Sequence, residues 1–210
     1  MFYRPAEGHP LPHDPFKALV VPRPIGWISS MDAEGRANLA PYSFFNGCGD
    51  NPPLVMFAQT GRKSRPEPIK DTIANVRATG EFACNIVSEA LAGKMNLTSG
   101  TYPPEVDEFA LAGLTPAPGV AISVPHVAEA PAVLECRVVR ILDDLPSHAA
   151  KMFNVMVIGE VVGVHIRDEV IRDGRVDYTA FRPVARLGYM DYTTVREVWA
   201  MERPGQGGGS

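Results

Sequence analysis

Basic side chains are concentrated in the segment GRKSRPEPIKDT, residues 61–72, of a chain whose formal net charge is -4. The segment stands between an apolar run and the first turn of a predicted helix, where unpaired N–H groups and the helix dipole favour an anion. Charged and neutral donors together suit phosphate oxygens. A solvated loop is the other interpretation, and composition alone favours neither. The residues concerned are Arg62, Lys63, Ser64, Arg65, Lys70, Asp71 and Thr72.

A second candidate is the stretch NLAPYSFFNG, residues 38–47. Pro41 has no N–H to donate, so a strand through this position must be an edge, a bulge or a break in pairing. Backbone groups released there, together with the Ser43 hydroxyl and the neighbouring aromatic rings, could face a flat polar ligand. The simpler interpretation is a kinked strand with two core phenylalanines, and this stretch alone favours it.

Other familiar catalytic patterns are missing from the sequence. The spacing leaves a Ser–His–Asp arrangement open, but there is no GxSxG motif. Neither GxGxxG nor GxxxxGK(S/T) occurs, which removes support for a Rossmann or P-loop nucleotide site. Three cysteines without CxxC spacing predict reduced, buried thiols at Cys48, Cys84 and Cys136. We predict no metal site, because no ligand spacing connects His9, His13, His126, His148 and His165.

Short strands must position most of these residues. Apolar runs and turn signals predict a hairpin from 24–31 and 37–45, strands over 54–60, 81–87, 132–142 and 152–166, a hairpin over 170–178 that turns at Asp173 and Gly174, and a last strand over 185–193. Residues 101–120 contain four prolines and are expected to form a loop.

One helix is clearly marked after the basic segment. Its signals are Ile69, Ile73 and Val76 on one face, Asp71 or Thr72 in the first turn, and Gly80 at the end. A second, shorter helix is expected over 88–97, with Ser88 as its N-cap.

The chain as a whole is predicted to be mainly β, a barrel with helical crossovers. We expect a surface extension over 1–22, one domain over 23–203 and a flexible tail over 204–210. The first residues of the chain lack the apolar core of a signal peptide, and no apolar run is long enough to span a membrane. A cytoplasmic protein is therefore expected. The acidic balance argues against a nucleic-acid partner.

Taken together, several blocks resemble the flavin reductase-like family of FMN-binding split barrels. The resemblance covers about residues 23–192, and the blocks are RPIGWISSMDAEGRANLAPYSFF, NPPLVMF, KDTIANVRATGEFACNIV, VIGEVVGVHI and RLGYMDY. It implies a six-stranded barrel of Greek-key type, a homodimer, and FMN near the subunit interface.

The same resemblance implies roles for single residues. The isoalloxazine side would be lined by Asn38, Ala40, Pro41, Ser43 and Phe44, and the phosphate and ribityl end by Thr60, Arg62, Ser64, Lys70, Asp71 and Thr72. Tyr189 would lie close to the flavin or to the partner subunit. Arg62 and Arg65 could hold either the FMN phosphate or a phosphate of an incoming NAD(P)H, while Lys63 is expected to face solvent.

The implied activity is that of an NAD(P)H-dependent flavin reductase, in which hydride passes from nicotinamide to flavin. No general acid or base is required of the protein. An FMN-bound electron carrier that does not use NAD(P)H and a flavin-binding module without turnover are the alternatives. A monooxygenase or another electron acceptor is the expected partner of a reductase.

Overall fold

The computed structural model describes residues 1–61, 70–148, 153–202 and 204. Its main element is a seven-stranded sheet in the order β3-β2-β6-β9-β10-β5-β4, and every neighbouring pair in it is antiparallel. The strands are β2 (Gly26–Met31), β3 (Ala37–Tyr42), β4 (Phe45–Asp50), β5 (Pro53–Gly61), β6 (Glu81–Ile86), β9 (Ala132–Leu142) and β10 (Phe153–Ile166).

Smaller sheets and short helices surround this sheet. The strands are β1 (Arg23–Pro24), β13 (Val184–Arg186) and β14 (Tyr192–Thr194) in one sheet, β7 (Pro116–Ala117) with β8 (His126–Val127), and β11 (Ile171–Arg172) with β12 (Arg175–Val176). The helices are α1 (Phe16–Leu19), α2 (Asp71–Thr79), α3 (Ala92–Leu97), α4 (Glu108–Leu111) and α5 (Tyr178–Phe181), with 3-10 turns η1 (Pro5–Glu7), η2 (Glu89–Leu91) and η3 (Asp168–Val170).

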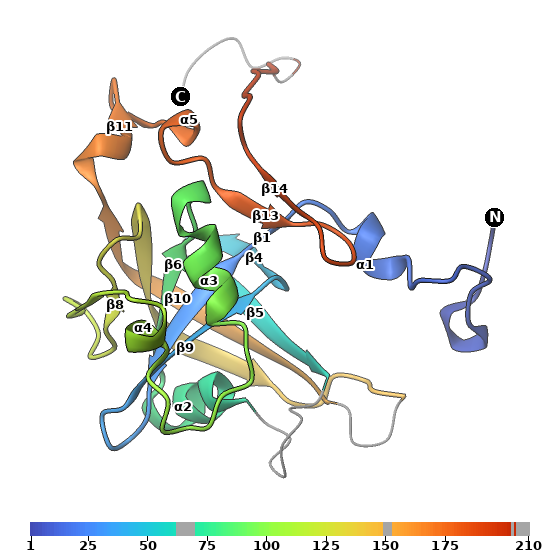
Figure 1. The fold of residues 1–210 in the computed structure, drawn as a ribbon, viewed down its shortest axis with the longest axis horizontal. Helices are drawn as coiled ribbons and strands as arrows, with labels where there is room; N and C mark the ends of the chain where they lie inside the picture. The colour runs from blue at the N-terminus through green and yellow to red at the C-terminus, as the bar shows by residue number, and fades with distance from the viewer. Residues whose placement is uncertain (62–69, 149–152, 203, 205–210) are drawn as a thin grey trace.

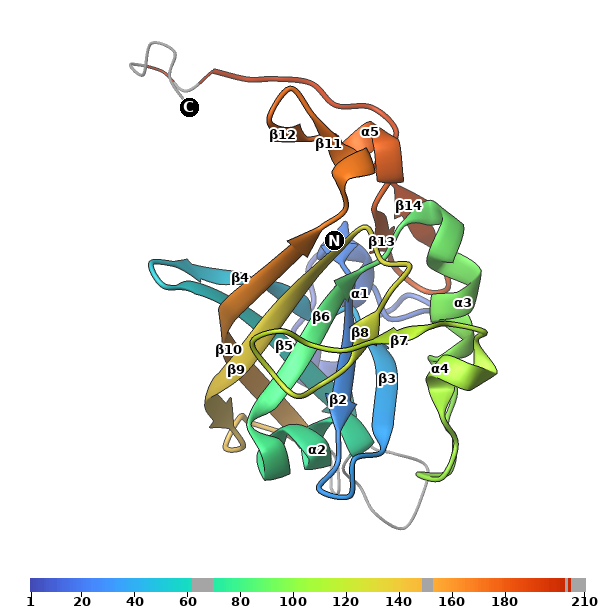
Figure 2. The same ribbon diagram turned by 90° about the vertical axis from the view of Figure 1, so that its left-hand side faces the viewer.

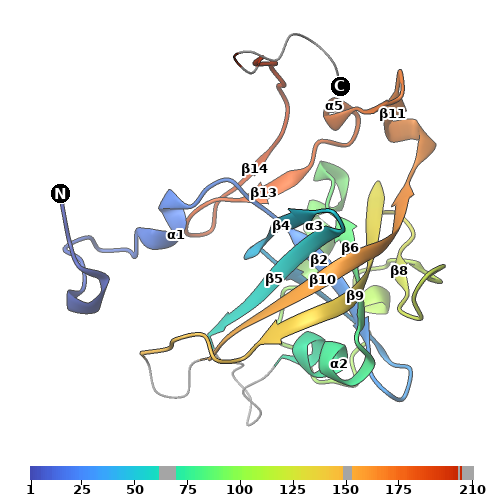
Figure 3. The same cartoon turned by 180° about the vertical axis from the view of Figure 1, so that it is seen from behind.

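The main sheet curls into a half-barrel, so the predicted β-barrel class with helical crossovers is confirmed (Figures 1 and 2). Helix α2 belongs to the connection from β5 to β6 and covers one end of the curl (Figure 3). The main sheet has seven strands rather than the expected six, because residues 45–50 form β4 beside β5. No helix in the described part of the chain is long and apolar enough to cross a membrane.

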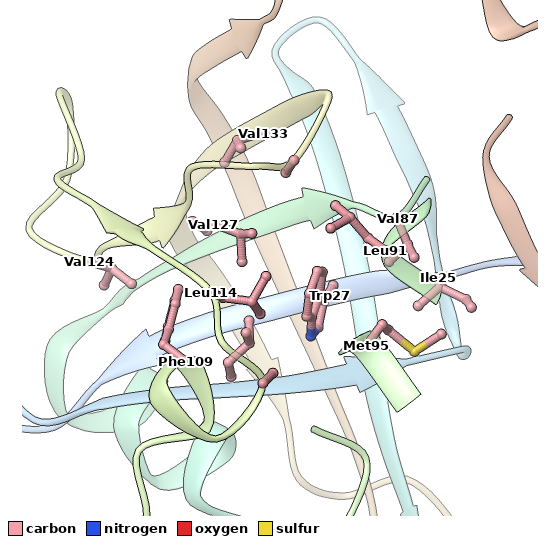
Figure 4. Packing of buried hydrophobic residues seen from close by; sticks show 14 of the residues in the cluster. Ile25, Trp27, Val87, Leu91, Met95, Phe109, Leu114, Val124, Val127 and Val133 are labelled. Carbon is pink, nitrogen blue, oxygen red and sulfur yellow. The ribbon is translucent and has the colours of Figure 1, made fainter. Parts of the chain in front are cut away.

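Strand β2 is buried on both of its faces because the protein has two hydrophobic clusters. Trp27 belongs to the outer cluster, which α3, α4 and β8 help to cover (Figure 4). Ile28, the next residue, points to the inner cluster inside the curl, where Ile73 and Val76 of α2 are also buried. Alternation of side chains along a strand explains this division.

Helix α2 ends as its sequence predicts. Gly80 adopts φ 71°, in the left-handed region, and its N–H donates to the Val76 carbonyl at 3.0 Å. Glycine is suited to this position because a Cβ is disfavoured at positive φ. Asp71 and Thr72 lie in the first turn, as predicted, and the N-cap position is held by Lys70, whose side chain forms no capping hydrogen bond. Ile69 lies outside the described residues.

The hairpins at 24–45 and 170–178 and the strands at 54–60, 81–87, 132–142 and 152–166 are confirmed within a few residues. Two other expectations are wrong in detail. The segment 185–193 forms parts of two short strands joined by a turn, because its middle residues cross between β13 and β14. Cys48 is exposed on β4, whereas the other two cysteines are buried. Ser88 is the N-cap of η2, as predicted, although its side chain makes no capping hydrogen bond.

Pro41 lies in an edge strand, one of the three situations that its sequence position allowed. The Leu39 N–H donates away from the sheet, to Glu108 at 3.2 Å. Because backbone groups alternate along an antiparallel strand, the nitrogen of Pro41 also faces away from β2. The proline therefore costs the β2–β3 ladder no hydrogen bond.

Candidate functional site

Two adjoining cavities lie along the edge strand β3, beside α3 and the first turn of α2. Their volumes are about 440 Å³ and 290 Å³. They share Pro41, Thr60, Lys70 and Ser99, so together they form one elongated site. Cavities of several hundred Å³ in total accommodate ligands the size of a mononucleotide. Figure 2 shows β3, α3 and α4 on the same side of the molecule.

The larger cavity is basic. Lys17, Arg23, Lys70 and Arg186 line it, and no Asp or Glu is found among its lining residues in the described part of the chain. Burial and, second, the nearby Arg186 lower the pKa of Arg23 below its usual value. Two guanidinium groups that repel each other in a cavity without a carboxylate would be stabilised by an anionic ligand.

Arg23 is fixed in the wall of this cavity by backbone carbonyls. It donates to Lys17 at 2.5 Å, Val20 at 2.6 Å and Leu187 at 2.8 Å, which ties the N-terminal segment to the turn after β13. Its guanidinium carbon lies 5.8 Å from the ring centroid of Phe44. The buried Nε atom has no hydrogen-bond partner among the described residues, so one donor stays available.

The turn between β13 and β14 forms the adjoining wall. Arg186 donates to the Tyr189 carbonyl and lies over the ring of Tyr192, 4.4 Å from its centroid. Tyr189 has φ 54°, an uncommon value for a non-glycine residue, and its ring contacts His13 edge-on at 5.7 Å. Tyr189 is half exposed, so it lies at the rim of the cavity.

The smaller cavity is polar and of mixed charge. Asn38 donates from Nδ2 to the Thr72 hydroxyl at 2.9 Å, which joins β3 to the first turn of α2. Asp71 and the mostly buried Glu108 also line this cavity. Burial raises the pKa of Glu108, and the negative charges of Asp71 and Asp107 act in the same direction, although its hydrogen bond from Leu39 opposes them.

Lys70 lies where the two cavities meet. Its backbone N–H donates to Oε1 of the buried Gln59 at 3.1 Å, which fixes the start of α2 against β5. Its ammonium group lies 5.0 Å from the centroid of the Tyr42 ring. Lys70 therefore presents positive charge to both cavities, and the first turn of α2, whose N–H groups lack intrahelical partners, borders the smaller one.

Helix α3 is held in place as a wall of the site by a buried hydrogen bond. Trp27 donates from Nε1 to the Thr98 hydroxyl at 2.9 Å, and that hydroxyl donates to the Met95 carbonyl at the same distance. The residues that follow, Ser99 to Tyr102, close the smaller cavity. An indole N–H inside a core needs such a partner, which explains why a threonine stands at this position.

Every described residue of the predicted site lines one of the two cavities: Asn38, Ala40, Pro41, Ser43, Phe44, Thr60, Lys70, Asp71, Thr72 and Tyr189. Arg62, Ser64 and Arg65, like Lys63, lie outside the described residues. Their part in the site stays a prediction.

Several lining residues were not predicted. Arg23 opens the block RPIGW and Arg186 opens RLGYMDY, so both stood in conspicuous motifs, but neither position showed that its side chain would reach the cavity. Glu108 lies in a region expected to be a loop, where α4 instead places it against β3. Tyr42, one of the aromatic residues expected near Pro41, also lines the larger cavity. The remaining unpredicted residues are Lys17, Ile25, Ala58, Met95, Asn96, Thr98, Ser99, Gly100, Thr101, Tyr102, Leu187, Met190 and Tyr192.

Comparison with known proteins identifies the fold family. A family model described as "Flavin reductase like domain" matches residues 18–189. The chain belongs to the flavin reductase-like family. An uncharacterised protein of Aquifex aeolicus is 38% identical over 171 residues, which cover 81% of this chain and 83% of that protein.

Two solved structures of similar proteins have functional names. Nitrilotriacetate monooxygenase component B from Bacillus cereus is 33% identical, with a TM-score of 0.85 over 96% of this chain and 98% of that one. The 2-nitrobenzoate 2-nitroreductase of Pseudomonas fluorescens is 30% identical, with a TM-score of 0.78 over 93% and 91% of the two chains. These comparisons support the split-barrel fold and oxidoreductase chemistry for this flavin reductase-like chain.

Proposed function

We propose that this protein binds FMN in the two adjoining cavities and is an NAD(P)H-dependent flavin reductase. The observation that carries the proposal is the basic, elongated site between β3 and the start of α2, in a chain of the flavin reductase-like family. The site fits a mononucleotide in size, in positive charge and in its unpaired buried donor on Arg23.

The phosphate end of FMN is assigned to the junction of the cavities. Lys70, Thr60 and the first turn of α2 supply a charged donor, a hydroxyl and the positive end of a helix there. Asp71 and Thr72 border the same point, and Asn38 orients the Thr72 hydroxyl. Arg62, Ser64 and Arg65 remain candidates for the same anion or for a phosphate of NAD(P)H.

The isoalloxazine end is assigned to the larger cavity. Pro41, Ser43 and Phe44 line it and offer backbone groups, a hydroxyl and an aromatic surface to a flat ring, while Ala40 borders the ring from the adjoining smaller cavity. Tyr189 at the rim limits access of water from one side. These residues bind and orient the ring rather than react with it.

Bound FMN would supply the redox chemistry, by accepting hydride from a nicotinamide and passing electrons onward. The protein's part is electrostatic. Arg23 and Arg186 place fixed positive charge in the larger cavity, where it would stabilise negative charge that develops on the ring. Burial raises the pKa of the Tyr42 phenol, so this lining residue stays protonated at neutral pH and contributes no charge of its own.

The protein is further proposed to act as a homodimer in the cytoplasm and to deliver electrons to a monooxygenase or another acceptor. The similarity to nitrilotriacetate monooxygenase component B supports an oxygenase partner. Exposed apolar residues on both terminal segments support self-association; they include Phe2, Phe16, Leu19, Val198, Trp199 and Met201.

Anaerobic titration tests this function. Purified protein loaded with FMN is mixed with NADH or NADPH, and the flavin absorbance is followed. Rapid bleaching by either nucleotide is the expected result. Bleaching by dithionite alone would favour the electron carrier or the module without turnover, and no binding of FMN would end the flavin assignment altogether.

A further inference from the structure

Two histidines and a glutamate from distant parts of the sequence meet at β8, β9 and β10, the group His126, Glu135 and His165. One ring nitrogen from each histidine and one carboxylate oxygen all lie within 4.8 Å of one another. Figure 3 shows β8 close to β9 and β10. The group shares no residue with the lining of the two cavities described above.

Glu135 is a fully buried carboxylate that is held by backbone N–H groups and a histidine. Its Oε1 accepts from the Val120 N–H at 2.8 Å and lies 2.6 Å from Nε2 of His165, and its Oε2 accepts from the Ala121 N–H at 2.6 Å. Within the described ranges, no Lys or Arg forms an ion pair with it. A buried carboxylate needs a cation or several donors to be stable.

His126 has an unused nitrogen. Its side chain is 9% exposed, and its buried Nδ1 has no hydrogen-bond partner in the described part of the chain. Its ring lies against that of His165, with centroids 4.5 Å apart. A buried, unpaired imidazole nitrogen beside a second imidazole and a buried carboxylate calls for a ligand.

Open space adjoins the group. His126 and His165 line a cavity of about 240 Å³, which leaves room for a water or another ligand. Arg167 also lines it, but this guanidinium is paired with Glu169 at 2.5 Å. Gly163 leaves room for the carboxylate, since a Cβ there would lie 3.2 Å from Oε2 of Glu135.

We propose that His126, Glu135 and His165 bind a divalent transition metal ion of the zinc class, as a two-histidine, one-carboxylate site with a further position open to the cavity. Two imidazoles and one carboxylate form a known protein ligand set for zinc. Metal–ligand bonds of about 2.0–2.2 Å would replace the hydrogen bond between His165 and Glu135. A small rotation of the partly exposed His165 would accommodate the ion.

The test is calorimetric titration of the FMN-loaded protein with zinc chloride. A Cys48→Ser background removes the exposed thiol as a competing ligand. We expect one zinc ion per chain, and a loss of affinity of at least about tenfold in His165→Ala, since even residues that only support a metal ligand alter affinity by about 10–100-fold. The matched control is His148→Ala, an exposed histidine outside the group, which should bind zinc as before.

The possible results distinguish a specific zinc site from nonspecific zinc binding. If zinc does not bind, or binds equally to the His165→Ala and His148→Ala proteins, the proposal is overturned. His126→Gln offers a second test, with circular dichroism to show that it folds; retained full affinity in this folded variant would also overturn the assignment. Because FMN binding is measured separately, failure of the flavin assignment would not be mistaken for failure of this one.

Discussion

At the scale of single residues, Lys70 has the central position in the candidate site. It is the only lysine or arginine that lines both cavities among the described residues, and its backbone is fixed by the buried Gln59. Its placement at the start of α2 adds the helix's positive end to its own charge. A side chain so placed should contribute directly to binding an anionic ligand.

Replacing Lys70 by alanine should weaken FMN binding by about 1–3 kcal/mol, because a hydrogen bond to a charged group is lost. This corresponds to a dissociation constant raised by about five- to 150-fold, measured by quenching of flavin fluorescence. Lys94→Ala is the control, since Lys94 donates to the Gly113 carbonyl and lines neither cavity. Equal affinities in the two variants would remove Lys70 from the site.

Glu108 should make the protein's stability depend on pH. Its pKa is raised in the folded state, mainly by burial, so the folded state binds a proton more tightly than the unfolded state does. This contribution to stability is present near and below the ordinary glutamate pKa of 4.5 and is lost as pH rises through the folded pKa.

Glu108→Gln, which keeps an acceptor for the Leu39 N–H, should therefore gain stability relative to the natural protein as the pH rises from 4.5 toward neutrality. Urea unfolding of both proteins across this range measures the difference in unfolding free energy. A difference that does not change with pH would contradict the raised pKa.

At the scale of elements, α2 is the helix that the sequence marks best and that the site uses most. Its apolar spacing and terminal glycine predicted both its existence and its end, because those signals are local. The pairing of β3 with β2 was equally predictable from the hairpin turn. Local chemistry thus defined the elements on one side of the site.

The other side of the site depends on contacts between distant segments. Arg23 reaches Leu187, and Glu108 reaches Leu39, through tertiary packing that no spacing in the sequence reveals. Strand β4 was missed because its glycines and polar residues resemble a loop, and only pairing with β5 makes it a strand. Of the ten predicted site residues that the structure describes, Pro41, Ser43, Phe44, Lys70, Asp71 and Thr72 were already candidates from local chemistry. Asn38, Ala40, Thr60 and Tyr189 came only from motif blocks matched to a family.

Gly80→Ala should lower the unfolding free energy by about 1–2 kcal/mol, since a Cβ is disfavoured at its positive φ while the space around it is open. Gly93→Ala in α3 is the matched control. It also has open space but ordinary helical geometry, so it should be neutral or stabilising by up to about 1 kcal/mol. Urea unfolding measures both, and equal effects would contradict the assigned role of the C-terminal glycine.

At the scale of the whole molecule, the two ends of the chain lie outside the barrel and expose apolar side chains. The described N-terminal residues and the segment after β14 extend away from the sheet (Figures 1 and 2). They expose apolar side chains such as Trp199, Met201 and Phe2, which are 75%, 77% and 82% exposed. Apolar groups on extended segments favour contact with a second chain.

Sedimentation of the FMN-loaded protein should therefore show a species of twice the 22.7 kDa chain mass. Trp199→Glu should shift the equilibrium toward the single chain, because a charge would have to be buried at the interface. Leu111→Glu on α4, an exposed apolar residue elsewhere, is the control. A single-chain mass for the natural protein with FMN bound would contradict the dimer.

Strand β2 has a consequence for how the protein opens. It contributes Trp27 to the outer cluster and Ile28 to the inner one, so neither cluster can separate without disturbing the other. Its amide hydrogens should exchange with deuterium only when the whole barrel unfolds, whereas those of the exposed strand β4 should exchange through brief local openings. The candidate flavin site is lined by the edge strand β3, which pairs with β2. It would therefore lie between a strand that opens only on global unfolding and segments that open locally.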